Sequence, residues 1–134
     1  MELENILYAG VQIAHNFGAA AVAGLPIAAL WFAPAQPAAR KVAWLTLLAW
    51  LTQCASGAGF GIVSFTMEGE LPQLHSLAMV ALGVKILCAV LAIFLLAMNL
   101  VMRVKTPLGN RTWISLTFFG FTALTCAAIL RWFS

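Results

Sequence analysis

His15 and Lys85 are two ionisable side chains that lie inside long apolar runs of the chain. Lys85 lies at the middle of the apolar run 71–102. Placing a lysine at the centre of a membrane span costs at least ~2.5–3.5 kcal/mol on insertion scales. Ionisable residues at such depth generally mark functional sites. All four acidic residues lie outside the apolar runs: Glu2, Glu4, Glu68 and Glu70. Lys85 is therefore expected to be neutral, hydrogen-bonded to a polar neighbour such as His15, or paired with an anionic ligand.

A second group of side chains consists of soft metal ligands. Met79 follows His75 by four residues, so the two share a helix face on which they could hold one ion, and Met67 lies in the loop before them. Imidazole, thioether and thiol ligands favour Cu(I). The predicted metal ligands are therefore His15, His75, Met79 and Met67. The cysteines are either secondary ligands or ordinary buried residues: Cys54, Cys88 and Cys126.

The elements that position these side chains follow from composition. Of 134 residues, 63% are hydrophobic and 8% charged, whereas soluble domains have about 45–50% and about 25%. Four apolar runs, at about residues 5–33, 42–65, 72–102 and 112–131, are each long enough to cross a bilayer as a helix. Short connections predict an all-α, integral membrane, up-down four-helix bundle forming a single domain over residues 1–134. Nucleic-acid binding is not indicated, because the basic residues sit at the ends of apolar runs.

The distribution of basic residues predicts the orientation of the bundle. Five of them fall on one side of the predicted membrane: Arg40, Lys41, Arg103, Lys105 and Arg111. Arg131 alone among the flanking basic residues falls on the other side, together with the four glutamates. The positive-inside rule then places both termini in the periplasm or exterior, and the chain in the inner (cytoplasmic) membrane as a multi-pass protein.

Residue counting predicts that His15 and Lys85 lie at one depth. Each is 17 residues before the cytoplasmic end of its span, taken as Phe32 and Met102 respectively. At ~1.5 Å of rise per residue, both lie roughly 25 Å from that end. His75 lies about three turns closer to the periplasmic side. The prediction is thus an imidazole and an amine facing each other inside the bundle.

The same counting adds small residues and a thiol to this layer. Counted from the cytoplasmic ends of their spans, the residues at this depth are Gly59 in the second span and those near Cys126 in the fourth. Small residues around Gly57 and Gly59 would let a flat cofactor approach the backbone. An alternative to copper is therefore a b-type haem, held by His15, Gly57, Gly59 and Lys85, in a protein of electron transfer or porphyrin oxidation.

Three segments carry a resemblance to a known family. They are His15-Asn-Phe-Gly-Ala-Ala followed by Trp31, Leu82-Gly-Val-Lys85 running on to Asn99 and Arg103, and Ala127-Ala-Ile-Leu-Arg-Trp. This pattern resembles the membrane core of the CopD-like copper-resistance proteins and, more distantly, the HemJ-type protoporphyrinogen oxidases. His15 and Lys85 are the residues that match in both. The first resemblance implies copper binding or transport, with a homo-oligomer or a periplasmic copper-binding protein as partner; the second implies a tetrapyrrole.

The leading hypothesis is therefore a copper-handling protein of the inner membrane, for which transport or metal binding is favoured over enzymatic activity without excluding the latter. Copper would enter at Met67, His75 and Met79 and meet His15 near Lys85. The haem protein is the second hypothesis. The third is a structural subunit of a larger membrane complex, in which Lys85 makes only a structural hydrogen bond.

Overall fold

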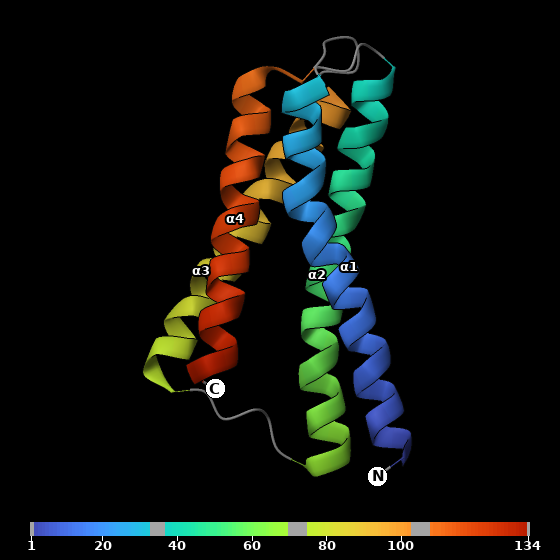
Figure 1. Cartoon of the computed structure of the whole chain (residues 1–134), viewed down its shortest axis with the longest axis vertical. Coiled ribbons are helices and arrows are strands. Elements are labelled where there is room, and N and C mark those ends of the chain that lie inside the picture. Colours follow the sequence, from blue (N-terminus) through green and yellow to red (C-terminus); the bar gives the residue numbers. More distant parts are fainter. Residues whose placement is uncertain (1, 33–36, 70–74, 103–107, 134) are drawn as a thin grey trace.

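Four long helices build the molecule (Figure 1). The computed structural model describes residues 2–32, 37–69, 75–102 and 108–133. The helices are α1 (Glu2–Phe32), α2 (Ala38–Glu68), α3 (Ser76–Ala97), which continues as the π-helical segment η1 (Met98–Met102), and α4 (Asn110–Phe133). Neighbours in sequence run antiparallel, so the predicted all-α up-down four-helix bundle is confirmed.

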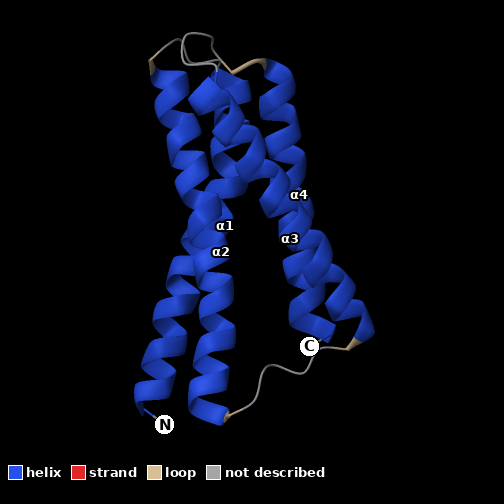
Figure 2. Ribbon diagram, turned by 180° about the vertical axis from the view of Figure 1, so that it is seen from behind, coloured by secondary structure: helices blue, strands red, loops and turns tan. Residues whose placement is uncertain are grey.

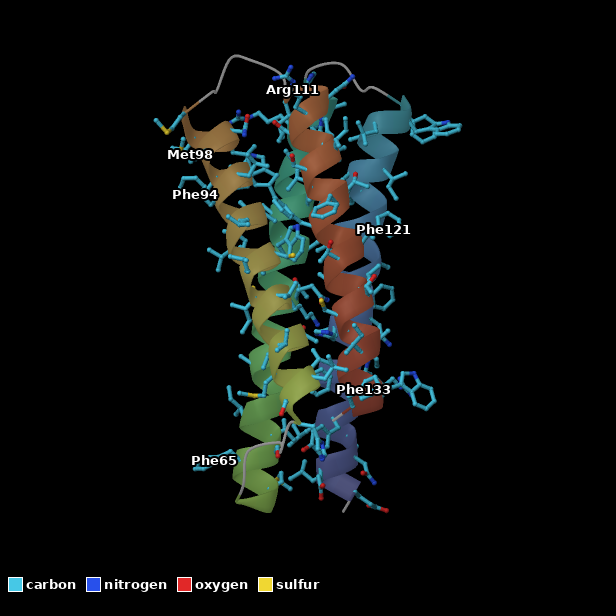
Figure 3. The ribbon with its side chains drawn as sticks, turned by 90° about the vertical axis from the view of Figure 1, so that its left-hand side faces the viewer. Phe65, Phe94, Met98, Arg111, Phe121 and Phe133 are labelled. Carbon is cyan, nitrogen blue, oxygen red and sulfur yellow. The ribbon has the colours of Figure 1, made fainter. Side chains whose placement is uncertain are left out.

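All four helices are long and apolar enough to cross a membrane, and the chain is a multi-pass membrane protein. Their outward side chains suit a lipid environment: Phe65, Phe94 and Met98 are exposed and point away from the bundle (Figure 3). The helices differ slightly from the predicted spans. α2 begins at Ala38, four residues before the predicted residue 42. The predicted start of the third span at residue 72 lies outside the described residues.

The bundle consists of two hairpins. α1 packs mainly on α2, and α3 mainly on α4, while α1–α4 and α2–α3 contacts join the hairpins and the backbones of α1 and α3 stay diagonal to each other. The hairpins lie together at one end and diverge toward the other (Figures 1 and 2). We call the first the closed end, which contains Phe32 and Asn110. The second, which contains Glu2 and Phe133, is the open end.

The closed end holds the core shared by all four helices. One hydrophobic cluster contains residues from each of them, including Val22, Trp50, Leu96 and Leu116. These four side chains are at most 1% exposed, so they are packed on every side. The indole Nε1 of Trp50 is buried there without a hydrogen-bond partner among the described residues. Packing of apolar side chains is therefore what joins the two hairpins at this end.

The backbones of the two hairpins come close where Gly120 of α4 packs on Val22 and Ala23 of α1. Pro26 lies inside α1 and has no N–H, so the carbonyl of Val22 lacks its usual partner four residues on. Gly120 packs on that carbonyl: a Cβ at Gly120 would lie 2.6 Å from Val22 O and 3.2 Å from Ala23 Cα. Only a glycine lets α4 come this near to the freed carbonyl without a clash.

The π-helical segment η1 is tied to the start of α2. Arg40 Nη2 donates to the carbonyl oxygen of Leu100, with a distance of 2.8 Å, and Leu100 itself is 1% exposed. Within α3 and η1, the Asn99 side-chain amide donates to Leu95 O at 2.7 Å. A π turn leaves backbone carbonyls in altered positions, and here a guanidinium meets one of them. The contact adds a polar link to the apolar packing of the closed end.

The open end differs because the two hairpins diverge there (Figures 1 and 2). Every buried residue of α1 lies at or after Gly18, and none lies nearer the N-terminus among the described residues. Val63 of α2 and Ala78 of α3 remain buried, 8% and 0% exposed, so the separate hairpins keep their own contacts. The functional candidates His15 and Lys85 lie where the closed end gives way to the open one.

Candidate functional site

The predicted pairing of His15 with Lys85 is confirmed. The two side chains come from the diagonal helices α1 and α3, and Lys85 Nζ lies 3.1 Å from His15 Nε2. Both side chains are partly buried. The contact reaches across the bundle at a level where the helix backbones themselves do not touch. It therefore links the two hairpins through a polar interaction instead of through apolar packing.

Ser56 of α2 binds the other ring nitrogen of His15. Its Oγ lies 2.8 Å from Nδ1, and the same Oγ lies 2.6 Å from Thr52 O in its own helix. Ser56 is 7% exposed, so water does not compete freely for these contacts. Both nitrogens of the imidazole consequently have protein partners, one from each hairpin.

The backbone and the ring faces of His15 are also held. The side-chain amide of Gln53 donates to the carbonyl oxygen of His15. Gly18 makes room for that amide, because a Cβ there would lie 2.7 Å from Gln53 Nε2. The ring of Phe60 packs edge-on against the imidazole, with ring centroids 5.4 Å apart. His15 is therefore fixed by three side chains of α2, while its contact with Lys85 comes from the opposite hairpin.

Two cysteines from other helices lie in the electrostatic neighbourhood of the Lys85 amine. Cys54 of α2 and Cys126 of α4 lie near enough to interact electrostatically with the Lys85 amine, and Cys126 interacts in the same way with Cys88 of α3. Cys88 and Cys126 are buried, whereas Cys54 is exposed. All three are free thiols. Together with His15, every helix contributes a nitrogen or sulfur donor to this level.

No carboxylate accompanies the pair. The sequence contains no Asp, and no Glu between Glu4 and Glu68 or after Glu70. The Lys85 amine bonds to His15, which offers one lone pair to an amine that carries two or three N–H bonds. The site therefore pairs the His15 imidazole, a possible metal ligand, with the Lys85 amine, which still has N–H bonds that could donate to another group. Both side chains lie in surroundings of low polarity.

The predicted glycines lie just beside this level. α2 starts one turn earlier than predicted, so the residue that faces His15 is Ser56 and not Gly59. Gly59 packs instead on Val11, one turn from His15 toward the open end, where an added Cβ would lie 3.4 Å from both valine methyl carbons. A Cβ at Gly57 would meet nothing within 4 Å. Gly59 therefore lies on the open side of the pair, whereas Gly57 is exposed and faces no neighbouring helix.

The predicted entry ligands lie at the open end, away from His15. His75 is the N-cap residue of α3, and its carbonyl accepts the N–H of Met79 at 3.0 Å. The side chains of His75, Met79 and Met67 are all exposed. Met67 belongs to the last turn of α2, and the ends of α2 and α3 are drawn apart in Figure 1. His75 and Met79 thus share one turn, and Met67 is on the other hairpin.

The His, Cys and Glu side chains do not form a complete metal site. Within residues 2–32, 37–69, 75–102 and 108–133, no three side chains of these types lie close enough together to hold a metal ion. Methionine, serine and lysine are not among these types. The arrangement accordingly offers one well-fixed imidazole with softer donors around it.

The predicted site did not include Gln53 and Ser56, and the structure gives both of them direct contacts to His15. The sequence pattern does contain an indication of them, because two polar residues three positions apart share one face of an apolar helix. Ser115 and Thr125 of α4, in contrast, bond to carbonyls of their own helix at 2.9 Å each.

Comparisons of the chain with models of protein families, with curated proteins and with solved structures find no match.

Proposed function

We propose that this membrane protein handles copper(I), and that His15 is its intramembrane ligand. The observation that carries the proposal is the contact between His15 Nε2 and Lys85 Nζ, 3.1 Å long, with the thiols of Cys54 and Cys126 in the electrostatic neighbourhood of the amine. Imidazole and thiol are ligands that select Cu(I). The resemblance to CopD-like proteins leads to the same ion.

A loose ligand set suits an ion in transit. Conduction requires sites that are favourable enough to enter and weak enough to leave. A closed site of three or four ligands would retain the ion, whereas His15 with a nearby Cys54 or Cys126 would hold it briefly. This is consistent with the absence of a complete metal-binding group in the described part of the chain.

Lys85 acts in this proposal as the competitor of the ion. Its amine occupies Nε2 of His15, so copper reaches that nitrogen only when the Lys85 side chain moves aside. No carboxylate inside the spans fixes the amine in place. The imidazole thus binds either the lysine N–H or the metal, which makes Lys85 a gate for the site.

The proposed path begins at the open end. Met67, His75 and Met79 are exposed there and would receive copper, either directly or from a periplasmic copper-binding protein. The positive-inside rule supports this end facing the periplasm, in an inner membrane, because the basic residues adjoin the closed end. A homo-oligomer would complete the path beyond His15 if one copy is not sufficient.

The test is Cu(I) binding by purified protein in detergent, measured by competition with a chromophoric chelator. We expect His15→Ala to weaken binding at least tenfold, and His15→Ala with His75→Ala to abolish it. Ser115→Ala is the matched control, because it removes a polar group of α4 near the closed end. Equal binding by wild type and the double variant would rule out the proposal.

A second candidate is a b-type haem or porphyrin protein. The observation that favours it is that His15 and Lys85 belong to different hairpins, which diverge toward the open end (Figure 2). A flat ring entering from that side would meet an axial imidazole, an amine suited to a propionate, and the side-chain-free positions Gly57 and Gly59. A Soret band after reconstitution with haem, lost in His15→Ala, would establish this function; its absence would exclude it.

A further inference from the structure

We infer that Ser56 is a positioning residue that holds His15 in one tautomer, with the proton on Nδ1 and the lone pair on Nε2. The inference rests on hydrogen-bond accounting around a buried hydroxyl. It needs neither copper nor haem, although its importance for ligand binding rests on the proposed function.

The accounting begins with the single proton of the Ser56 hydroxyl. Its Oγ lies 2.6 Å from Thr52 O and 3.3 Å from Gln53 O, and both carbonyl oxygens can only accept. A contact of 2.6 Å between two oxygens, at the short end of the range for O–H···O bonds, needs a proton between them. The hydroxyl therefore donates to its own helix and has only lone pairs left for His15.

The contact between Ser56 Oγ and His15 Nδ1, at 2.8 Å, must then take its proton from the ring. Nδ1 carries the hydrogen and donates to the hydroxyl oxygen. If Nδ1 were bare, Ser56 would have to turn its proton toward the ring and leave two oxygens facing each other at 2.6 Å without one. The buried environment, with Ser56 at 7% exposure, makes such an unpaired contact costly.

The second ring nitrogen follows from the first. A neutral imidazole with hydrogen on Nδ1 has its lone pair on Nε2, and Lys85 Nζ lies 3.1 Å from that atom. The amine therefore donates and Nε2 accepts.

The backbone of the same residue is held independently. Gln53 donates to His15 O, Gly18 leaves the space for that amide, and Phe60 packs against the ring. With the backbone fixed and one ring nitrogen bound, the imidazole cannot exchange its two nitrogens by turning over. Nε2 is thus the atom presented to anything that displaces Lys85, which is how the partners of a ligating histidine usually fix its orientation.

The experiment is nitrogen-15 NMR of histidine-labelled protein in detergent at pH 8, without added metal or haem. The chain has two histidines, and exposed His75 serves as the internal reference for an imidazole that averages its tautomers. We expect His15 to show a protonated Nδ1 and a bare Nε2, identified by two-bond couplings to the ring hydrogens. A proton on Nε2, alone or with one on Nδ1, would overturn the assignment.

Variants test whether Ser56 is the cause. Ser56→Ala should shift His15 toward the averaged pattern of His75, whereas Ser56→Thr, which keeps a hydroxyl, should retain the Nδ1–H form. Ser115→Ala removes an equivalent bond to the residue four positions earlier and should leave His15 unchanged. An unchanged tautomer in Ser56→Ala would overturn the inference. If that variant does not fold, Ser56→Cys, whose sulfur is a weak acceptor, takes its place under the same criterion.

Discussion

The two ends of the bundle are built in different ways. At the closed end, side chains from all four helices form one apolar cluster, and α4 touches the backbone of α1 at Gly120. At the open end, the hairpins diverge, and α1 has no buried residue before Gly18 among those described. His15 and Lys85 join the hairpins at the boundary between these regions.

Different parts of the bundle therefore provide its stability and its candidate ligand-binding side chains. Segments that bind ligands are generally drawn from the less stable parts of a protein, since they must open or rearrange. Here the apolar cluster supplies stability without any charged residue, and the His15–Lys85 contact lies beside the part of the bundle where the hairpins diverge. The ends should therefore respond differently to the same kind of substitution.

The largest difference is expected for glycines. Gly120→Ala would place a Cβ 2.6 Å from Val22 O, so the helices must separate, and overpacking of this kind costs about 1–3 kcal/mol. Gly10→Ala, at the open end, meets nothing within 4 Å and should gain up to about 1 kcal/mol of helix propensity. Reversible unfolding in mixed micelles measures both. If Gly120→Ala and Gly10→Ala changed the free energy of unfolding in the same direction and by the same amount, the distinction between the two ends would be lost.

A smaller effect is expected at the boundary. Gln53→Ala removes the bond to His15 O and should lower the free energy of unfolding by about 0.5–1.5 kcal/mol. Thr52→Val is the matched control, since the Thr52 hydroxyl bonds within α2, to Leu48 O at 2.9 Å. The same unfolding assay compares the two variants. If Thr52→Val costs as much as Gln53→Ala, the link between α1 and α2 contributes nothing of its own.

Lys85→Met should change total stability by less than about 1 kcal/mol, because methionine replaces a polar contact with apolar area. Its effect should instead be local. Amide hydrogen exchange is expected to rise in α1 before His15 and to stay unchanged around Val22. Lys41→Met, at the closed end, should alter neither region. Faster exchange around Val22 in Lys85→Met would show that the two ends are coupled.

The smallest effect is expected in the middle of the closed end. Trp50→Phe removes an indole N–H that is buried without a partner among the described residues. Relief of that unpaired donor, worth about 1–3 kcal/mol, offsets the area lost with the smaller ring. Stability should therefore stay within about 1 kcal/mol of wild type. A loss above about 3 kcal/mol would mean that packing of the indole dominates.

The sequence predicted most of the architecture and part of the site. Four apolar runs were sufficient for the fold, because only helices of that length satisfy their backbone inside a bilayer. Counting residues from the span ends placed His15 and Lys85 at one depth, and the structure confirms their contact. The rise per residue is constant in a helix, so depth can be predicted even when packing is unknown.

What the sequence did not predict depends on tertiary packing. Counting from residue 42 selected Gly59, but α2 starts at Ala38, so the partner of His15 is Ser56. Helix ends are the least certain part of such a prediction. The divergence of the hairpins was also not foreseen, since it results from where Gly120 and Val22 allow close approach and not from any single run of residues.

The carbonyl freed by Pro26 bears on how the protein is made. α1 is synthesised before α4, and on its own in lipid the Val22 oxygen would lack the N–H donor four residues on, which bilayers tolerate poorly. Gly120 packs against that oxygen once α4 has docked. Biogenesis of the first span is thus complete only after the fourth has been inserted, and a chain truncated before α4 should be a substrate for quality-control proteases.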